Sequence, residues 1–314
     1  MAVSVGSERL ARVGDASKFP VPSAAVRQNC GTAAYVPLYH PTSHPPGTDC
    51  SGGPVVILPD VHAAQGQPIV KIGFVTDLHY REAVPGDAPN PKRESRRVGT
   101  LLLRCLQHLQ DAGAELVLVA GDNVDSPLDD PRLNADLVSL RDMLSASGIP
   151  FVIIPGNHDP DPEAFYRVLP MPPRAFRLGD CEIITFCDDM FDRQMKCASR
   201  QTGVLNEMRG LLSSVPSSIR HTILLQHYVL HPEQEHHGSD YRYNYLNDGE
   251  IRTILEASPR KILSLSGHLH RGHPLVTHNG VSYLVGRALC EHPFPYHMLH
   301  TRAEKIDIQE FHGI

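Results

Sequence analysis

The chain has 314 residues, of which 41% are hydrophobic and 20% are charged, and this suits one large α/β domain or two small ones. Its formal net charge of −6 argues against a general binder of the nucleic-acid backbone, since such proteins need a basic surface that releases counterions. The 19 His residues are more than a generic enzyme of this size needs, so their positions become the main question.

The cysteines and the apolar runs exclude other classes of protein. Seven Cys are present, an odd number without a C-x-x-C pair, so neither a zinc ribbon nor a disulfide framework is indicated. Residues 1–14 lack the apolar centre of a secretory signal, and no run of 18 apolar residues predicts a membrane span. We therefore expect a cytoplasmic protein without a membrane partner, and the sequence indicates no oligomeric state.

Residues 1–68 differ from the rest of the chain. They contain nine of the 27 prolines and no sustained helical period, which is typical of a partly irregular extension. The apolar run 55–58 predicts one edge strand within it. Residues 69–314 are then expected to form the functional domain.

From residue 69 the pattern becomes regular, with apolar runs that alternate with segments of helical period. Strands are predicted at 69–76, 116–120 and 151–154. A helix is predicted at 96–112, and Asp130 is expected to cap a second helix that begins at Pro131.

The second half of the chain continues in the same way. Strands are predicted as a pair within 176–186, at 222–225, at 262–265, near 296–300 and near 305–311. Helices are predicted at 204–212 and at 251–255, the second capped by Asn247. The dipeptide Asn279-Gly280 stands between two apolar runs and predicts a hairpin turn.

Five of these strands end in clusters of Asp, Asn or His. Ligands of α/β sheets bind beyond the carboxyl ends of the strands, so residues far apart in the chain converge there. The candidate metal ligands are Asp77, His79, Asp122, Asn157, His227, His268 and His270. This mixed set of nitrogen and oxygen donors without a thiolate suits Mn, Fe or Zn, and seven ligands suffice for two ions if one carboxylate bridges them.

Two metal ions about 3.5–4 Å apart form the clamp that proteins use for in-line displacement at phosphorus. A hydroxide that bridges the ions attacks the phosphorus in such a centre. His158 directly follows the candidate ligand Asn157, so its imidazole is a candidate to protonate the leaving oxygen. Asp159 is the candidate to orient His158 and to favour its charged form.

Together these motifs resemble the calcineurin-like metallophosphoesterase superfamily, whose pattern is D-x-H, GD, GNH(D/E), H and GHxH in that order. The resemblance covers about residues 69–314 and is complete in Asp77-x-His79, Gly121-Asp122, Gly156-Asn157-His158-Asp159, His227 and Gly267-His268-x-His270. It implies an α/β fold with two packed mixed β-sheets flanked by helices, a four-layer α/β/β/α sandwich. It also implies one metal ion held by Asp77, His79, Asp122 and His270, and a second held by Asp122, Asn157, His227 and His268. Asp122 bridges the two ions, and His158 acts near the leaving group.

Within that superfamily the size of the chain resembles bacterial class III cyclic-nucleotide phosphodiesterases. That subgroup has His-His-Pro-Pro around the third-block histidine, whereas this chain has Gln226-His227-Tyr228-Val229. The loop 123–126 also matches the subgroup only loosely. Specificity for cyclic nucleotides therefore does not follow from the resemblance.

Several residues near the motifs leave alternatives open. Asp125 either supports a ligand or is a loop acid, and the sequence slightly favours the loop acid. The segment 231–245, with three Tyr and three His, either lines the substrate pocket or is a solvated loop. Arg271 either meets a phosphate or lies on the surface, while His292 and His297 are expected to be structural.

The leading functional hypothesis is hydrolysis of a phosphomonoester or phosphodiester in a small phosphorylated substrate. A DNA nuclease of the same superfamily is the first alternative, but the acidic charge and the lack of a basic stretch argue against nucleic acid. The second alternative is a non-catalytic, metal-binding interaction scaffold. Because every candidate ligand is present in this chain, the enzyme is the better hypothesis.

Overall fold

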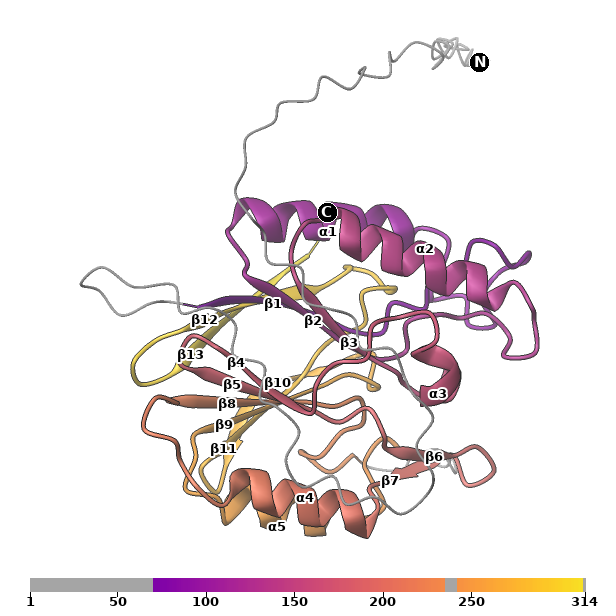
Figure 1. Cartoon of the computed structure of the whole chain (residues 1–314). Helices are drawn as coiled ribbons and strands as arrows, with labels where there is room; N and C mark the ends of the chain where they lie inside the picture. Colours follow the sequence, from indigo (N-terminus) through magenta and orange to yellow (C-terminus); the bar gives the residue numbers. More distant parts are fainter. Residues whose placement is uncertain (1–69, 235–241, 313–314) are drawn as a thin grey trace, which may run out of the picture. The chain divides into compact units, whose positions relative to one another are not determined.

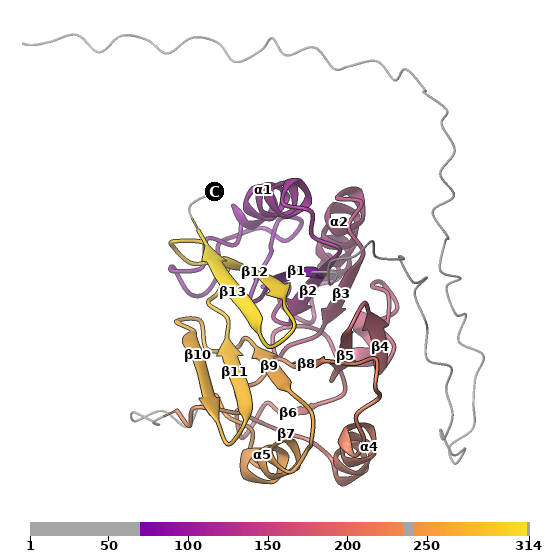
Figure 2. The ribbon, with the colours of Figure 1, turned by 90° about the vertical axis from the view of Figure 1, so that its left-hand side faces the viewer.

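Two mixed β-sheets packed face to face form the centre of the computed structural model, which describes residues 70–234 and 242–312. The predicted extension 1–68, with its strand at 55–58, lies outside the described residues, so the boundary at residue 69 stays a prediction. Figure 1 shows the two sheets between two pairs of helices, and Figure 2 shows the same layers after a quarter turn.

The first sheet has the order β13-β12-β1-β2-β3. Its strands are β1 (Lys71–Val75), β2 (Leu116–Ala120), β3 (Phe151–Ile154), β12 (Tyr296–Thr301) and β13 (Ile306–Phe311). The first three are parallel, and the last two continue the sheet in antiparallel pairing. Helices α1 (Val98–Asp111) and α2 (Leu133–Ala146) cover its outer face.

The second sheet has the order β10-β11-β9-β8-β5-β4. Its strands are β4 (Ala175–Leu178), β5 (Cys181–Thr185), β8 (His221–Leu225), β9 (Ile262–Ser266), β10 (His273–His278) and β11 (Val281–Val285). Helices α4 (Thr202–Leu212) and α5 (Asp248–Glu256) cover its outer face. A short helix, α3 (Pro162–Phe165), and a small hairpin of β6 (Met190–Asp192) and β7 (Cys197–Ser199) lie outside both sheets.

The central strands are apolar along their whole length because both of their faces are covered. Every residue of β2, β8 and β9 is buried, as expected for parallel strands between layers. Between the sheets, Phe74 and Leu118 share one apolar cluster with Ile223 and Leu265. These layers confirm the predicted α/β sandwich.

Most of the predicted elements are found with bounds shifted by a few residues, and hydrogen bonds explain two of the differences at helix starts. Residues 130–132 form a turn, in which Asp130 accepts a hydrogen bond from the backbone N–H of Arg132 (2.9 Å), so α2 begins two residues later than predicted. Asn247 precedes α5 but does not cap it, because its side chain bonds both backbone groups of Arg200 instead. The predicted hairpin turn at Asn279-Gly280 is confirmed, with φ of 46° and 82°.

Two expectations from composition can be compared with the described residues. Cys105, Cys181, Cys187, Cys197 and Cys290 are buried and free of disulfides. Among the helices of residues 70–234 and 242–312, none combines the length and apolar character that crossing a bilayer requires.

Asp159 ties together the loops that follow β2 and β3. Its buried carboxylate accepts hydrogen bonds from the backbone N–H groups of Asn123 (3.0 and 3.1 Å), Val124 (3.1 Å) and Gly156 (2.8 Å). It also accepts one from the side-chain amide of Asn123 at 2.8 Å. The carboxylate thus satisfies buried donors on two loops at once, which fixes the relative positions of the motifs on them.

We expect Asp159→Asn to lower the free energy of unfolding by about 2–3 kcal/mol, because an amide offers one acceptor oxygen and leaves buried N–H groups unbonded. Urea unfolding of the metal-free protein measures the change. The control is Asp142→Asn on α2, whose side chain is 61% exposed; its effect should stay within about 0.5 kcal/mol. Equal midpoints for the two variants would contradict this role of Asp159.

Candidate metal centre

The seven predicted ligands lie where five parallel strands of the two sheets end. Asp77 and His79 follow β1, Asp122 follows β2, and Asn157 follows β3. In the second sheet His227 follows β8, whereas His268 and His270 follow β9. The structure therefore brings together residues from opposite ends of the domain, such as Asp77 and His270.

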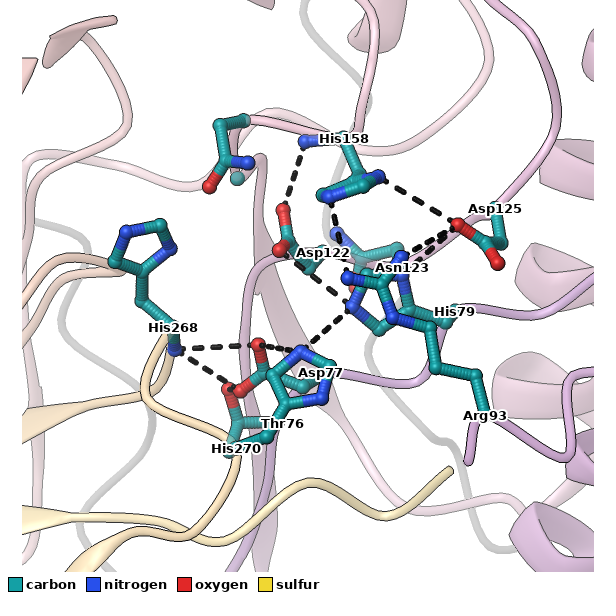
Figure 3. Close-up of polar contacts among 12 residues, drawn as sticks. Thr76, Asp77, His79, Arg93, Asp122, Asn123, Asp125, His158, His268 and His270 are labelled. Atoms are coloured by element: carbon teal, nitrogen blue, oxygen red, sulfur yellow. Dashed lines mark hydrogen bonds and ion pairs between the residues drawn. The ribbon is translucent and has the colours of Figure 1, made fainter. Parts of the chain in front are cut away.

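The first group of donors consists of Asp77, His79, Asp122 and His270, whose ligand atoms all lie within 4.8 Å of one another. Nε2 of His79 and Nε2 of His270 are only 3.1 Å apart. Nε2 of His79 is 3.6 Å from a carboxylate oxygen of Asp122, and Nε2 of His270 is 3.5 Å from one of Asp77. Two imidazole nitrogens that face each other between two carboxylates make a donor set suited to a cation (Figure 3).

The second group consists of Asp122, His227 and His268, again within 4.8 Å. Nε2 of His227 lies 3.3 Å from Oδ1 of Asp122 and 3.2 Å from Oδ1 of Asn157, so the amide oxygen joins this group. Asp122 belongs to both groups and presents a different oxygen to each. Because the two donor sets share one carboxylate and contain no thiolate, the residues fit a pair of metal ions.

Two of the imidazoles are hydrogen-bonded at Nδ1 and a third has a carboxylate near its Nδ1, which directs Nε2 of each ring into the centre. His227 Nδ1 lies 2.7 Å from the carbonyl oxygen of Ala120, and His270 Nδ1 lies 2.6 Å from Glu291. His79 Nδ1 is 3.4 Å from Asp125. Acceptors of this kind select the tautomer and the ring orientation of histidines that bind metals.

The backbone of the centre is strained. Asp77, His79, Asp122 and His268 all have positive φ, between 47° and 67°, which non-glycine residues rarely adopt. Such conformations cost about 1–3 kcal/mol each and persist where the surrounding contacts over-determine them. Here the backbone N–H of His79 donates to the carbonyl of Asp122 at 2.9 Å, and that of His268 donates to the Asp77 carboxylate at 3.0 Å.

Two motif glycines are required by close approach. A Cβ on Gly156 would lie 2.3 Å from Oδ1 of Asp122, and one on Gly267 would lie 1.9 Å from Oγ1 of Thr76. Both distances are far below a van der Waals contact. The glycines in front of Asn157 and His268 therefore let the loops close around the carboxylates.

Burial and charge set the protonation of the centre. Burial lowers the pKa of His79 to about 3, so this ring is neutral and its nitrogen lone pair is available. Burial alone would raise the pKa of Asp122, but the nearby His227 and His158 hold it well below its usual value. Burial would likewise lower the pKa of His227, yet the Asp122 carboxylate raises it to about 9. A bound cation would take the place of the His227 proton as the countercharge of Asp122.

His158 lies beside the centre, and its acidic neighbour is not the predicted one. Asp159 is occupied by the backbone donors described above, so the prediction that it orients His158 is wrong. Instead, His158 Nδ1 lies 3.5 Å from Oδ1 of Asp125. Asp125 is buried and contacts His79 as well, which also corrects its interpretation as a loop acid.

A cavity of about 570 Å³ opens next to Asn157 and His158. Phe191, Arg193 and Lys196 of the β6–β7 hairpin also line this cavity. Phe191 stacks on Tyr228 with ring centroids 5.8 Å apart, and Arg193 donates to the carbonyl of Asn157 at 2.8 Å. This hairpin was not predicted from the sequence, so the sequence did not reveal this wall of the cavity.

The open alternatives near the motifs resolve differently for each residue. Residues 235–241 of the segment 231–245 lie outside the described residues; at its ends, His231 stacks on His278, and Tyr243 contacts the ring of His268. Arg271 is exposed and donates to Gln234 at 2.9 Å. His292 and His297 contact Phe294 and Glu310 respectively, in line with structural roles.

Sequence reasoning missed Glu291 and Arg93. Glu291 follows no strand of the predicted series, and Arg93 belongs to a charged stretch in front of α1 that looks like a solvated surface. Only their contacts in three dimensions, with His270 and with Asp125 and His158, connect them to the centre.

Comparison with known proteins identifies a family whose members share this fold. The model of the calcineurin-like phosphoesterase family matches residues 70–272, more than half of the chain. A dimetal phosphatase from Danio rerio has a TM-score of 0.63 at 12% identity, over 79% of this chain and 97% of that one. The purple acid phosphatase PPD1 from yellow lupin (Lupinus luteus) seeds has a TM-score of 0.56 at 13% identity, over 79% of this chain and 52% of that one. A search among curated proteins found no match.

At such low identity the two solved structures show that the fold is shared, whereas the family match covers the strands that carry all five motifs. The chain therefore belongs to the calcineurin-like phosphoesterase family and is a metal-dependent phosphoesterase.

Proposed function

We propose that Asp77, His79, Asp122 and His270 hold one metal ion, that Asp122, Asn157, His227 and His268 hold a second, and that this centre hydrolyses a small phosphomonoester or phosphodiester. The observation that carries the proposal is the position of Asp122, whose two carboxylate oxygens face two separate groups of donors. The metals are Mn, Fe or Zn, because the donors are imidazoles and hard oxygens.

When bound, the metal ions activate water for attack and neutralise charge on the phosphoryl oxygens. The chain itself supplies the remaining chemistry. Asp125 lies 3.5 Å from Nδ1 of His158 and supports the charged form of the ring, so His158 is the group that delivers a proton to the leaving oxygen. The cavity beside His158 receives the leaving group, and its volume of about 570 Å³ suits a small molecule.

Loss of a shared or essential ligand should abolish turnover. We expect Asp122→Asn and His227→Ala each to lower kcat/KM for an aryl phosphoester by about 1,000-fold or more, because metal ions supply several kcal/mol of charge stabilisation. Chromogenic assays give the rate, and elemental analysis gives the metal content. His278→Ala is the matched control, since this histidine is exposed on β10. Undiminished turnover in either ligand variant would refute the assignment.

Removal of the metals should cost stability as well as activity. Chelation is expected to abolish turnover and to lower the melting temperature, because ions at 100 times their Kd stabilise the folded state by about 2.7 kcal/mol. Differential scanning calorimetry with and without added Mn²⁺, Fe²⁺ or Zn²⁺ measures the shift. Asp122→Asn should show a much smaller shift than the parent protein. Identical melting curves for the parent protein with and without metal, together with negligible metal content, would instead favour a scaffold.

A further inference from the structure

Arg93 reaches the candidate centre from a segment that contributes none of the predicted ligands. It lies in the loop between β1 and α1, and its side chain is only 14% exposed. The loop is fixed on both sides of it, because the backbone N–H of Arg93 donates to Asn90 (3.0 Å) and that of Glu94 donates to Cys290 (2.8 Å). In Figure 3 the guanidinium lies between His158, His79 and Asp125.

The guanidinium of Arg93 is incompletely bonded. Nη1 donates to Oδ1 of Asp125 at 2.9 Å, and Nη2 lies 3.4 Å from Nε2 of His158. Nε is buried and has no hydrogen-bond acceptor among the described residues. An arginine has five N–H donors in a rigid fork, and a buried donor without an acceptor costs about 1–3 kcal/mol. Arg93 therefore presents a positive charge and a buried, unbonded N–H group next to His158, the proposed proton donor.

Neighbouring arginines are arranged differently. Arg81 donates to the backbone carbonyls of Val84, Asp125 and Pro85, and Arg96 donates to those of Glu82, Val84 and Gly86. Arg97 is exposed and pairs with Glu94. The first two hold the loop in shape and the third lies on the surface, whereas Arg93 faces the centre.

The carboxylate of Asp125 neither fully neutralises the charge of Arg93 nor accepts all of its N–H donors. Asp125 is also 3.4 Å from His79 and 3.5 Å from His158, and it accepts a hydrogen bond from the Ser95 hydroxyl at 3.3 Å. Its single negative charge is thus shared among several groups. The planar guanidinium fork matches two oxygens of a phosphate, and arginine stays charged at all relevant pH values.

We propose that Arg93 binds the phosphoryl group of the substrate and makes the enzyme prefer phosphomonoesters to phosphodiesters. The inference rests on the proposed function of the neighbouring centre. A phosphomonoester dianion has three non-bridging oxygens and close to two negative charges, whereas a diester has two such oxygens and one charge. An additional cation with free donors therefore stabilises the monoester more than the diester.

The test compares Arg93→Gln with the parent protein on p-nitrophenyl phosphate and on bis(p-nitrophenyl) phosphate. For the monoester we expect kcat/KM to fall by about 10- to 100-fold, the range of a lost charge-assisted contact to a phosphoryl oxygen, and we expect a change below about threefold for the diester. Arg93→Lys keeps the charge but not the fork, so it should recover part of the loss. Titration calorimetry of the metal-loaded protein with inorganic phosphate should show about tenfold weaker binding by Arg93→Gln.

Two further variants separate binding from positioning. Arg97→Gln removes an exposed arginine from the same segment and should change kcat/KM for neither ester. Ser95→Ala weakens the support of Asp125 without removing the guanidinium, so any effect should be equal for the two esters. Thermal unfolding of every variant identifies those that are not folded.

An equal loss on both esters in Arg93→Gln, matching Ser95→Ala, would overturn the proposal and leave Arg93 a support for Asp125. Unchanged phosphate affinity in Arg93→Gln, or no phosphate binding by the parent protein, would overturn it as well. A parent protein that binds phosphate but turns over neither ester would count against the proposed hydrolysis, while the phosphate titration would still decide the role of Arg93.

Discussion

The arrangement of the centre depends on the burial of two carboxylates, Asp77 and Asp122. Buried anions are expensive unless positive charge or hydrogen-bond donors surround them. The fold supplies these through the histidines at the ends of the neighbouring strands and through backbone N–H groups, such as those of His158 and His268 on Asp122 and Asp77. The strained backbone at four of the proposed ligands follows from the same demand, because only tightly folded loops bring these donors close enough. Without metal ions the protein balances part of this charge by a proton on His227, whose pKa Asp122 raises to about 9, and a pair of cations would complete the balance.

The two-sheet sandwich is what makes such a concentration of polar groups possible. Parallel strands place their carboxyl ends at one edge, and stacking two sheets brings β1, β2 and β3 of one to the same edge as β8 and β9 of the other. The free energy gained by burying apolar residues between the sheets offsets the cost of burying polar groups at this edge. Strands such as β2 contribute to this gain because they are buried along their whole length. Strand ends are therefore rigid supports for ligands, while the loops beyond them remain free to define what the site accepts.

The fold class and the residues at the strand ends could be predicted from the sequence because both depend on local patterns. An apolar run followed by Gly-Asp or Gly-Asn-His predicts the strand and places its polar end, without any knowledge of the neighbours. Partners across space could not be predicted in this way. Asp159 directly follows His158 in the chain, yet it bonds the backbone of Asn123, whereas Asp125, on the loop after β2, faces the imidazole. Glu291 and Arg93 approach the centre from loops whose sequences carry no sign of that approach.

The difference from the class III subgroup at Gln226 has a physical explanation in the buried network next to the cavity. Gln226 stands where a related subgroup has a second histidine, and its side-chain oxygen accepts a hydrogen bond from Arg200 at 3.2 Å. Arg200 is fully buried, donates to Asp189 at 2.8 Å and to the Tyr245 hydroxyl at 2.9 Å, and lies over the ring of Phe186. Because Asp189 directly precedes β6 and Arg200 directly follows β7, this ion pair closes the base of the hairpin that bears Phe191 and Arg193. Gln226, which directly precedes His227, thus helps to hold the hairpin that forms part of the cavity wall.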